Sequence, residues 1–280
     1  MVDRINNASG VLGALKQLQS ANRDLSTADT RVSSGLRVAR ARDDASAFNT
    51  AAVMRGQGAS LSVVTLSLSR AESISDTAIA AGEQAMKQLS AMKATASQAM
   101  SGGLTDDQRA VLQKQYQDQM STLQSFIRNS SFDDTNILDG SQQPNGVSFI
   151  ADADATQTLT LAGRNFMPGA GVVTAMPSTT ALNNTQSAAD TQKLLDESIA
   201  NMGDQLAEMG AERKRIEAQK GFVGKLADAL AAGVGRMVDT DGSAESALIQ
   251  ALQVKQELSA SAISIANSAP QALLSLFRPV

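Results

Sequence analysis

A heptad repeat of unusual length constrains this chain more than any other feature of its sequence. Between about residues 44 and 100, apolar and small side chains alternate at spacings of three and four residues for more than five heptads. This pattern is typical of an α-helix that packs along a narrow seam on a partner helix. At about 1.5 Å per residue, such a helix is roughly 80 Å long, which favours a coiled coil or rod-like bundle. The predicted seam residues are Leu61, Val64, Leu68, Ala71, Ser75, Ala78, Gly82, Ala85, Leu89, Met92, Ala96 and Ala99.

Four further helices are predicted from periodicity and capping signals, over residues 7–37, 105–128, 188–238 and 243–276. The 105–128 helix is expected to begin with a capping box of Thr105 and Gln108. Its predicted inner stripe is Leu112, Tyr116, Gln119, Leu123 and Phe126. The helix over 188–238 carries apolar residues at strict seven-residue spacing. Arg213 and Lys220 interrupt its second row, which predicts a polar contact or a register device at these positions. In the 243–276 helix, two rows at seven-residue spacing are expected. One is Ala244, Ala251, Leu258, Ile265 and Ala272, and the other is Leu248, Lys255, Ala262, Ala269 and Leu276.

The first helix has a seam with large residues on one side and small residues on the other. Val11, Leu18, Leu25 and Val32 recur every seven residues, and each is followed three positions later by alanine or glycine. Residues 1–42 are predominantly basic and residues 239–280 predominantly acidic, which modestly favours pairing of the two ends. Such a pair buries little apolar surface, while ordering each residue costs about 1–2 kcal/mol. We therefore expect these arms to become ordered only when their outer apolar faces meet other copies, which indicates a self-assembling protein.

The middle of the chain, about residues 130–185, differs in composition from the helices. It contains three of the five prolines and many Thr, Asn and Asp residues. Residues 147–150 and 158–161 have the character of short strands. The predicted fold is therefore mainly α, a long antiparallel coiled-coil or helical rod with a small β-hairpin element.

Several chemistries are excluded by composition. The chain has no Cys and no His, so disulfides, ordinary structural zinc sites and His-dependent catalysis are absent. With 24 basic against 28 acidic residues, it lacks the basic excess of a nucleic-acid-binding protein. It contains no apolar run long enough for a membrane span, and its first residues do not follow the pattern of a cleaved signal peptide. We expect no enzyme activity, cofactor, metal, nucleic acid or membrane insertion.

Motifs near both ends resemble those of bacterial flagellin. Residues 25–38 match the N-terminal pattern L-x-x-x-x-x-R-[LV]-S-S-G-x-[RK]-[IV], and residues 41–45 resemble A-x-D-D-A. Residues 236–241 resemble [RN]-[IL]-x-D-x-D, residues 266–276 match A-N-x-x-P-Q-x-x-L-x-L, and residues 136–140 are similar to N-L-L-x-G. The residues that carry the main terminal motifs are Arg31, Ser33, Ser34, Gly35, Asp43, Asp44, Asp239, Asp241, Asn267, Pro270 and Gln271.

The resemblance implies a subunit of the flagellar filament, the propeller for swimming motility. It implies paired terminal helices over 1–42 and 239–280 that form the inner filament core, an outer-core bundle over 43–140 and 186–238, and a short variable surface region over 141–185. The implied partners are other copies of the chain, the flagellar type III export apparatus, an export chaperone, and hook-associated and filament-cap proteins. The implied location is the extracellular filament, reached without a cleaved signal peptide. The expected polymerisation interface comprises Val11, Leu18, Leu25, Val32, Leu258, Ile265, Leu273 and Leu276.

Three alternatives remain open at this point. A hook–filament junction or other hook-associated protein would share related terminal helices. A generic coiled-coil scaffold would not need the terminal motifs. A carboxylate enzyme could use Asp133 with Asp134, or Asp239 with Asp241, although neighbouring aspartates in loops are far more often caps or solvated turns.

Overall fold

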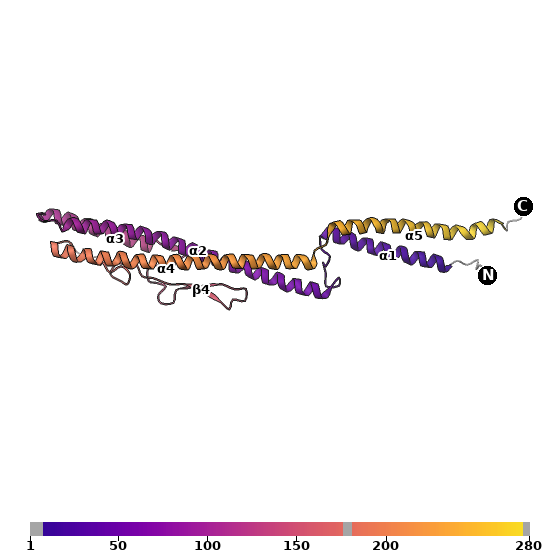
Figure 1. Cartoon of the computed structure of the whole chain (residues 1–280), viewed down its shortest axis with the longest axis horizontal. Coiled ribbons are helices and arrows are strands. Elements are labelled where there is room, and N and C mark those ends of the chain that lie inside the picture. Colours follow the sequence, from indigo (N-terminus) through magenta and orange to yellow (C-terminus); the bar gives the residue numbers. More distant parts are fainter. Residues whose placement is uncertain (1–7, 176–180, 277–280) are drawn as a thin grey trace. The chain divides into compact units, whose positions relative to one another are not determined.

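The structure is a computed structural model that describes residues 8–175 and 181–276. The described residues form five helices and four short strands (Figure 1). The helices are α1 (Ala8–Ser34), α2 (Ala45–Ala99), α3 (Asp106–Arg128), α4 (Thr185–Val238) and α5 (Gly242–Leu276). The strands are β1 (Ser131–Phe132), β2 (Thr135–Asn136), β3 (Val147–Ile150) and β4 (Thr158–Leu161). The prediction of a mainly α fold with a small β-hairpin is therefore confirmed.

Contacts within the chain define two units. The central unit comprises residues 57–229, and the terminal unit comprises residues 1–56 and 230–280. Among the described helices, none is both long and apolar enough to cross a lipid bilayer.

In the central unit, α2 packs antiparallel to α4. Lys93 pairs with Asp196, and Glu72 pairs with Arg213, so rising residue numbers on α2 meet falling numbers on α4. The seam predicted for α2 is confirmed, because all twelve of its residues are buried. Gly82 lets the helices approach closely, since a Cβ atom at this position would lie 2.6 Å from Leu206 Cδ2.

The apolar face of α4 and a stripe of α3 complete the central helical core. The α4 row predicted at seven-residue spacing is buried from Leu195 to Val223. The buried stripe of α3 differs in part from the predicted one. Tyr116 and Leu123 are buried as predicted, but the other buried positions are Gln113, Met120 and Ile127. Thr105 and Gln108 form the predicted capping box at the start of α3. The helix runs back along α2, where Gln88 Nε2 donates to the carbonyl of Gln119 at 3.1 Å.

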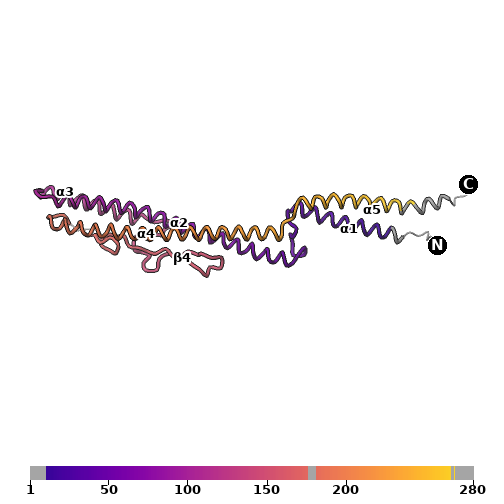
Figure 2. Tube along the Cα trace, viewed as in Figure 1, coloured from indigo at the N-terminus to yellow at the C-terminus, as the bar shows by residue number. Residues whose placement is uncertain are grey.

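The segment between α3 and α4 lies alongside α4 (Figure 2). Its strands β3 and β4 pair antiparallel with the bounds predicted from sequence, and Phe149 lies opposite Leu159. Two side chains attach the hairpin region to the helices: Ser67 Oγ accepts from the amide of Ile150, and Gln219 Nε2 donates to the carbonyl of Ala151. The smaller β1–β2 hairpin was not predicted, because strands of two residues carry no periodicity.

In the terminal unit, α1 and α5 lie side by side and antiparallel (Figure 1). Arg31 on α1 pairs with Glu245 near the start of α5, and Asn22 accepts from Gln256 further along. The small residues Ala21 and Ala28 form the buried centre of α1, as the first-helix seam predicted.

The rows predicted for α5 do not form its buried contact with α1. Leu248, Lys255, Leu258 and Ile265 are all exposed. The buried positions are Glu245, Leu252 and Ser259, one residue further along the chain than the predicted row of Ala244, Ala251 and Leu258. Leu252 is the large apolar side chain in this buried row, whereas Val254, Leu258 and Ile265 are more than half exposed.

Candidate assembly surface and its junction

The helix pair of the terminal unit leaves several large apolar side chains exposed. On α5 Leu258 is 66% exposed and Ile265 is 70% exposed, values usual for charged side chains. The described exposed apolar residues of the two helices are Leu12, Leu15, Val32, Leu248, Val254, Leu258 and Ile265. Large apolar side chains exposed in this number favour an interaction site.

The expected interface residues do not all lie in the same environment. Val11, Leu18 and Leu25 are half-buried beside the α1–α5 contact, whereas Val32, Leu258 and Ile265 are exposed. Leu273 and Leu276 lie in α5, but their side chains fall outside the described part of the chain. The same holds for the motif residues Asn267, Pro270 and Gln271.

The Ser-Ser-Gly motif ends α1 and turns the chain. Gly35 has φ +70°, a left-handed conformation that glycine adopts without strain. The hydroxyl of Ser34 accepts from the amide of Leu36 at 3.2 Å, and Ser33 Oγ donates to the carbonyl of Thr30. The carbonyl of Gly35 then accepts from the amide of Thr240 at 2.9 Å, which joins the end of α1 to the α4–α5 connection.

Four aspartates of the terminal motifs organise this junction through backbone contacts. Asp43 Oδ2 accepts from the amides of Ala39 and Arg40. Asp44 Oδ1 accepts from the amide of Ala47 at the start of α2, and Asp241 Oδ1 accepts from the amides of Ser243 and Ala244 at the start of α5. Both are helix N-caps, and the negative charges also suit the positive ends of the helices. Asp239 forms an antiparallel bridge with Leu36.

A small apolar cluster lies under the junction. Val38, Ala51, Val234 and Val238 are its buried members, and Phe48 packs against them. The guanidinium of Arg37 donates to the carbonyl of Met237 at 2.6 Å, so a long arginine side chain covers the end of α4.

Arg31 makes an ion pair across the helix pair. Its Nη1 lies 3.5 Å from Glu245 Oε1, and the Glu245 side chain is nearly buried. The carboxylate oxygen has no hydrogen bond to it within the described residues, so the contact is an ion pair alone. Within the residues that the structure describes, this is the only ion pair between α1 and α5. It agrees with the opposite net charges of the two ends of the chain.

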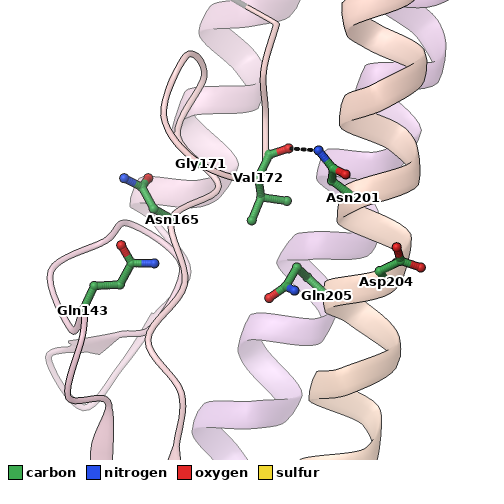
Figure 3. Close-up of a pocket in the computed structure, with 7 residues that line it drawn as sticks. All are labelled: Gln143, Asn165, Gly171, Val172, Asn201, Asp204 and Gln205. Carbon is green, nitrogen blue, oxygen red and sulfur yellow. Dashed lines mark hydrogen bonds between the residues drawn. The ribbon is translucent and has the colours of Figure 1, made fainter.

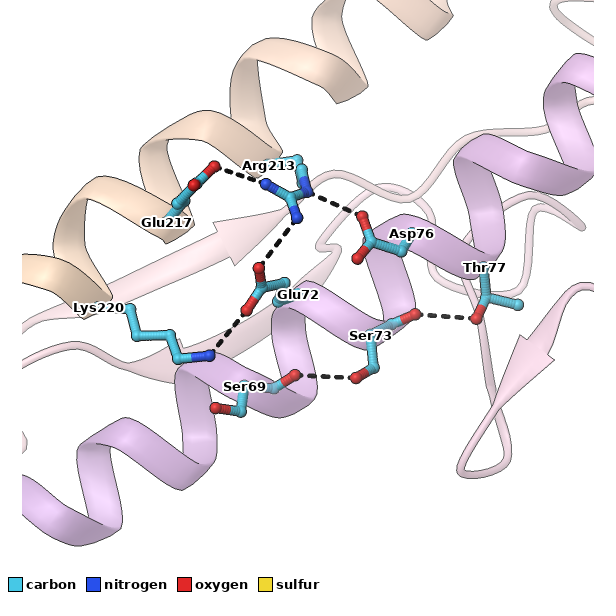
Figure 4. Close-up of polar contacts among 8 residues, drawn as sticks. All are labelled: Ser69, Glu72, Ser73, Asp76, Thr77, Arg213, Glu217 and Lys220. Carbon is cyan, nitrogen blue, oxygen red and sulfur yellow. Dashed lines mark hydrogen bonds and ion pairs between the residues drawn. The ribbon is translucent and has the colours of Figure 1, made fainter.

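Arg213 and Lys220, which interrupt the apolar row of α4, form an ion network with α2 (Figure 4). Arg213 contacts Glu72 at 3.0 Å, Asp76 at 2.8 Å and Glu217 at 2.6 Å, and Lys220 contacts the other oxygen of Glu72 at 2.9 Å. The hydrogen bond to Asp76 and the neighbouring carboxylates raise the pKa of Arg213 above its ordinary value. The predicted polar contact is confirmed, and it joins specific positions of the two helices.

Arg164 anchors the middle segment and was missed by sequence analysis. Its side chain is only 4% exposed and contacts Glu212 at 2.9 Å and Gln205 Oε1 at 3.0 Å. Beside it, Asn201 Nδ2 donates to the carbonyl of Val172 across a shallow polar hollow that Asp204 and Gln205 also line (Figure 3). A lone arginine in a Thr-, Gly- and Asn-rich segment is the available sequence signal, but it does not identify the partner.

The motif at residues 136–140 also has a structural role. Asn136 is buried, and its amide nitrogen donates to the carbonyl of Ile127 at 2.8 Å, near the end of α3. Its Oδ1 accepts from the amide of Leu138, and Gly140, with φ +86°, donates its amide to the carbonyl of Arg164. The motif therefore closes α3 and joins it to the middle segment.

The aspartate pairs considered for catalysis have structural contacts. Asp133 and Asp134 occupy the tight turn between β1 and β2 with φ +49° and +58°, and Asp133 pairs with exposed Arg70 at 2.7 Å. Across the described residues, no group of three or more Asp or Glu side chains is arranged to hold a metal ion.

Comparison with known proteins matches both helical parts of the chain. Residues 5–143 match the family model of the bacterial flagellin N-terminal helical region, and residues 192–277 match that of the C-terminal helical region. The chain belongs to the bacterial flagellin family. Flagellin FljJ of Caulobacter vibrioides is 35% identical over 277 residues, which cover 98% of each chain. A flagellin of Brucella melitensis is 31% identical over 288 residues, covering 96% of this chain and 97% of the relative.

Family membership gives this flagellin its biological role. It is a structural subunit that polymerises with other copies into the bacterial flagellar filament, an extracellular assembly. These matches are all to flagellins, so nothing favours the alternative of a hook-associated protein. The N-terminal motif and the two aspartate motifs described above form the turn and helix caps of one junction, which explains why those residue types occur together.

Proposed function

We propose that this flagellin polymerises through the outer apolar face of its α1–α5 pair. The observation that carries the proposal is the exposure of several large apolar side chains on this pair. Ala21 and Ala28 of α1 are buried with Leu252 of α5, while Leu12, Leu15, Val254, Leu258 and Ile265 are exposed to solvent. Contacts with neighbouring copies would remove these side chains from water, with about 1.5–3 kcal/mol for each large side chain buried.

The proposal includes the division of labour between the chain's segments. Residues 1–42 and 239–280 would form the inner filament core, 43–140 and 186–238 the outer core, and 141–185 the surface. Within the inner core, Val11, Leu18, Leu25, Val32, Leu258, Ile265, Leu273 and Leu276 would contact other copies. We also expect no enzyme activity, because the aspartate pairs considered for catalysis lie in a tight turn and in the junction, where they have structural contacts.

Export of the subunit requires a chain that can be threaded in an unfolded state. We infer that the chain leaves the cell unfolded through the flagellar type III export apparatus, with an export chaperone and without a cleaved signal peptide. A chain without cysteine has no disulfide to prevent threading. The hook-associated and cap proteins would then meet the same apolar face at the two ends of the filament.

The test replaces Leu258 and Ile265 together by Gln in the full chain. Loss of two apolar contacts of roughly 1.5–3 kcal/mol each raises the critical concentration for assembly more than tenfold. Assembly is measured by sedimentation and electron microscopy after salt-induced polymerisation. Circular dichroism of the monomer should show little change, because both side chains are exposed in the isolated chain.

The matched control replaces Ser261 and Ser264 by Gln, also at exposed positions of α5. It introduces the same residue type without removing apolar surface and should assemble like the wild type. Normal filaments from the Leu258/Ile265 variant would overturn the proposal. An equal loss in the control pair would show that the apolar side chains have no specific role, and would also count against it.

A further inference from the structure

A groove lined by arginines lies beside the end of α1. Its walls include Ser26, Thr30 and Leu36, and four arginines with one aspartate supply its charge. These charged residues are Arg31, Arg37, Arg40, Arg42 and Asp43. All of them belong to the terminal unit, so the groove is formed within one unit.

The positive charge of the groove is only partly compensated by the chain's own carboxylates. Arg31 faces Glu245, and Arg42 reaches Asp43 at 3.8 Å, an exposed and long contact. Asp43 is itself engaged by backbone amides, and Arg37 donates to a neutral carbonyl. Neither Arg37 nor Arg40 forms an ion pair with any residue that the structure describes. A guanidinium group that has no acidic partner can bind a carboxylate of another molecule through two parallel hydrogen bonds.

A matching acidic flank occurs on α4 in the central unit. Asp190, Glu197 and Asp204 follow one another at seven-residue spacing, and all three are exposed. This spacing keeps them on one face, with a rise of roughly 10 Å between neighbours. Asp190 has a weak contact with Lys193 at 3.8 Å, but Glu197 and Asp204 have no ion-pair partner among residues 8–175 and 181–276.

The overall charge of the two units favours the same pairing. Residues 57–229 carry 19 acidic and 13 basic side chains, whereas the rest of the chain has a slight basic excess. In a polymer of identical copies, every subunit presents both a basic groove and an acidic flank at high local concentration. Complementary charges of this kind fix orientation and register between partners more than they add affinity.

We infer that the groove, formed by Arg31, Arg37, Arg40 and Arg42, receives the acidic flank of α4 from a second copy of this chain. The inference rests on the proposed function, because it requires that copies assemble. It adds a polar contact with defined partners to the apolar contact of the α1–α5 pair. The apolar face supplies most of the affinity, and the groove selects the relative position of neighbouring subunits.

The experiment reverses charge on each side and then on both. The first variant carries Arg40→Glu with Arg42→Glu, the second carries Glu197→Arg with Asp204→Arg, and the third combines all four substitutions. At low ionic strength, each reversal on one side raises the critical concentration by about tenfold, because attraction becomes repulsion. The combined variant returns towards the wild-type value, since opposite charges meet again.

A control variant with Lys114→Glu and Arg128→Glu matches the net-charge change of the groove variant, and both side chains are exposed on α3. It should assemble as the wild type does. The defects should shrink as salt is raised, because screening weakens contacts between exposed charges. Circular dichroism on each monomer checks that the substitutions leave the helices intact.

The inference is overturned if the groove variant assembles normally, or if the combined variant is no better than the single-sided ones. The latter result would mean that the groove meets a different acidic partner. These outcomes leave the proposed function untouched, because that is judged by the Leu258/Ile265 variant measured in parallel. Normal assembly of that variant would overturn the proposed function while the charge-reversal results remained interpretable.

Discussion

At the scale of single residues, Tyr116 is the most informative reporter in the molecule. It is the one tyrosine of the chain, it is 1% exposed, and burial raises its pKa from 10.0 to about 12. Because the unfolded chain loses the phenolic proton at lower pH than the folded chain, stability falls as the pH rises through this range. The contribution is complete below pH 10 and is lost progressively up to about 12. Its size is at most about 3 kcal/mol.

The prediction is checked by following the near-ultraviolet absorbance of tyrosinate, which no tryptophan obscures. The folded protein should titrate near pH 12, and the protein in denaturant near the ordinary value of 10. Tyr116→Phe should lose stability less steeply over this interval than the wild type does. A titration midpoint near 10 in the folded state would show that the phenol is not shielded from water.

At the scale of secondary-structure elements, the end of α1 depends on one glycine. Gly35 has φ +70°, and no atom lies within 4 Å of the position that a Cβ atom would occupy. Gly35→Ala therefore introduces backbone strain without a steric clash, and should lower the free energy of unfolding by about 1–2 kcal/mol. Denaturant unfolding monitored by circular dichroism measures the change.

A second glycine provides the control for that substitution. Gly58 lies inside α2 and also has open space around it, but its backbone is helical. Gly58→Ala should raise stability by about 0.5–1 kcal/mol, because alanine has the higher helix propensity. If both substitutions changed stability in the same direction, the left-handed turn would not explain the role of Gly35.

The elements also differ in how well sequence predicts them. In α2 every predicted seam residue is buried. The helices that pack against α2 belong to the same chain, so both rows of its seam contribute to a single core. In α5 the apolar rows were identified as a seam, yet Leu258 and Ile265 are exposed and Glu245 is buried. Periodicity reveals that a face is apolar, but it does not reveal whether the partner is another helix of the chain or another copy.

The junction was predictable in part. The terminal motifs identified Gly35, Asp43, Asp44, Asp239 and Asp241 as important residues. The resemblance of these motifs to a family did not show how the residues are arranged in space. Their roles as turn and caps follow from backbone contacts between the start and the end of the chain. Arg164 could not be assigned a partner in advance, because Gln205 and Glu212 lie more than forty residues away in sequence.

At the scale of the whole molecule, the two units should respond differently to truncation. Deleting residues 1–30 or 255–280 removes part of the α1–α5 pair, while the central unit retains its own contacts over residues 57–229. Each truncated protein should remain soluble and largely helical but should fail to polymerise. Circular dichroism and sedimentation after salt-induced assembly measure the two properties.

Full-length protein prepared in parallel provides the control for assembly competence. Normal filaments from either truncated protein would contradict the role of the terminal helices. Complete loss of helical signal would contradict the independence of the central unit. The first outcome therefore tests the role of the terminal helices in assembly, and the second tests whether the central unit folds independently.

The large apolar side chains left exposed on the α1–α5 pair have a consequence for the turnover of subunits. A subunit surrounded by neighbours can leave only by exposing its outer apolar face to water at once, which makes escape from the interior very slow. A subunit at the growing end lacks some of those neighbours and leaves more readily. Exchange of subunits should therefore concentrate at the tip, and an old filament should keep its original subunits along most of its length.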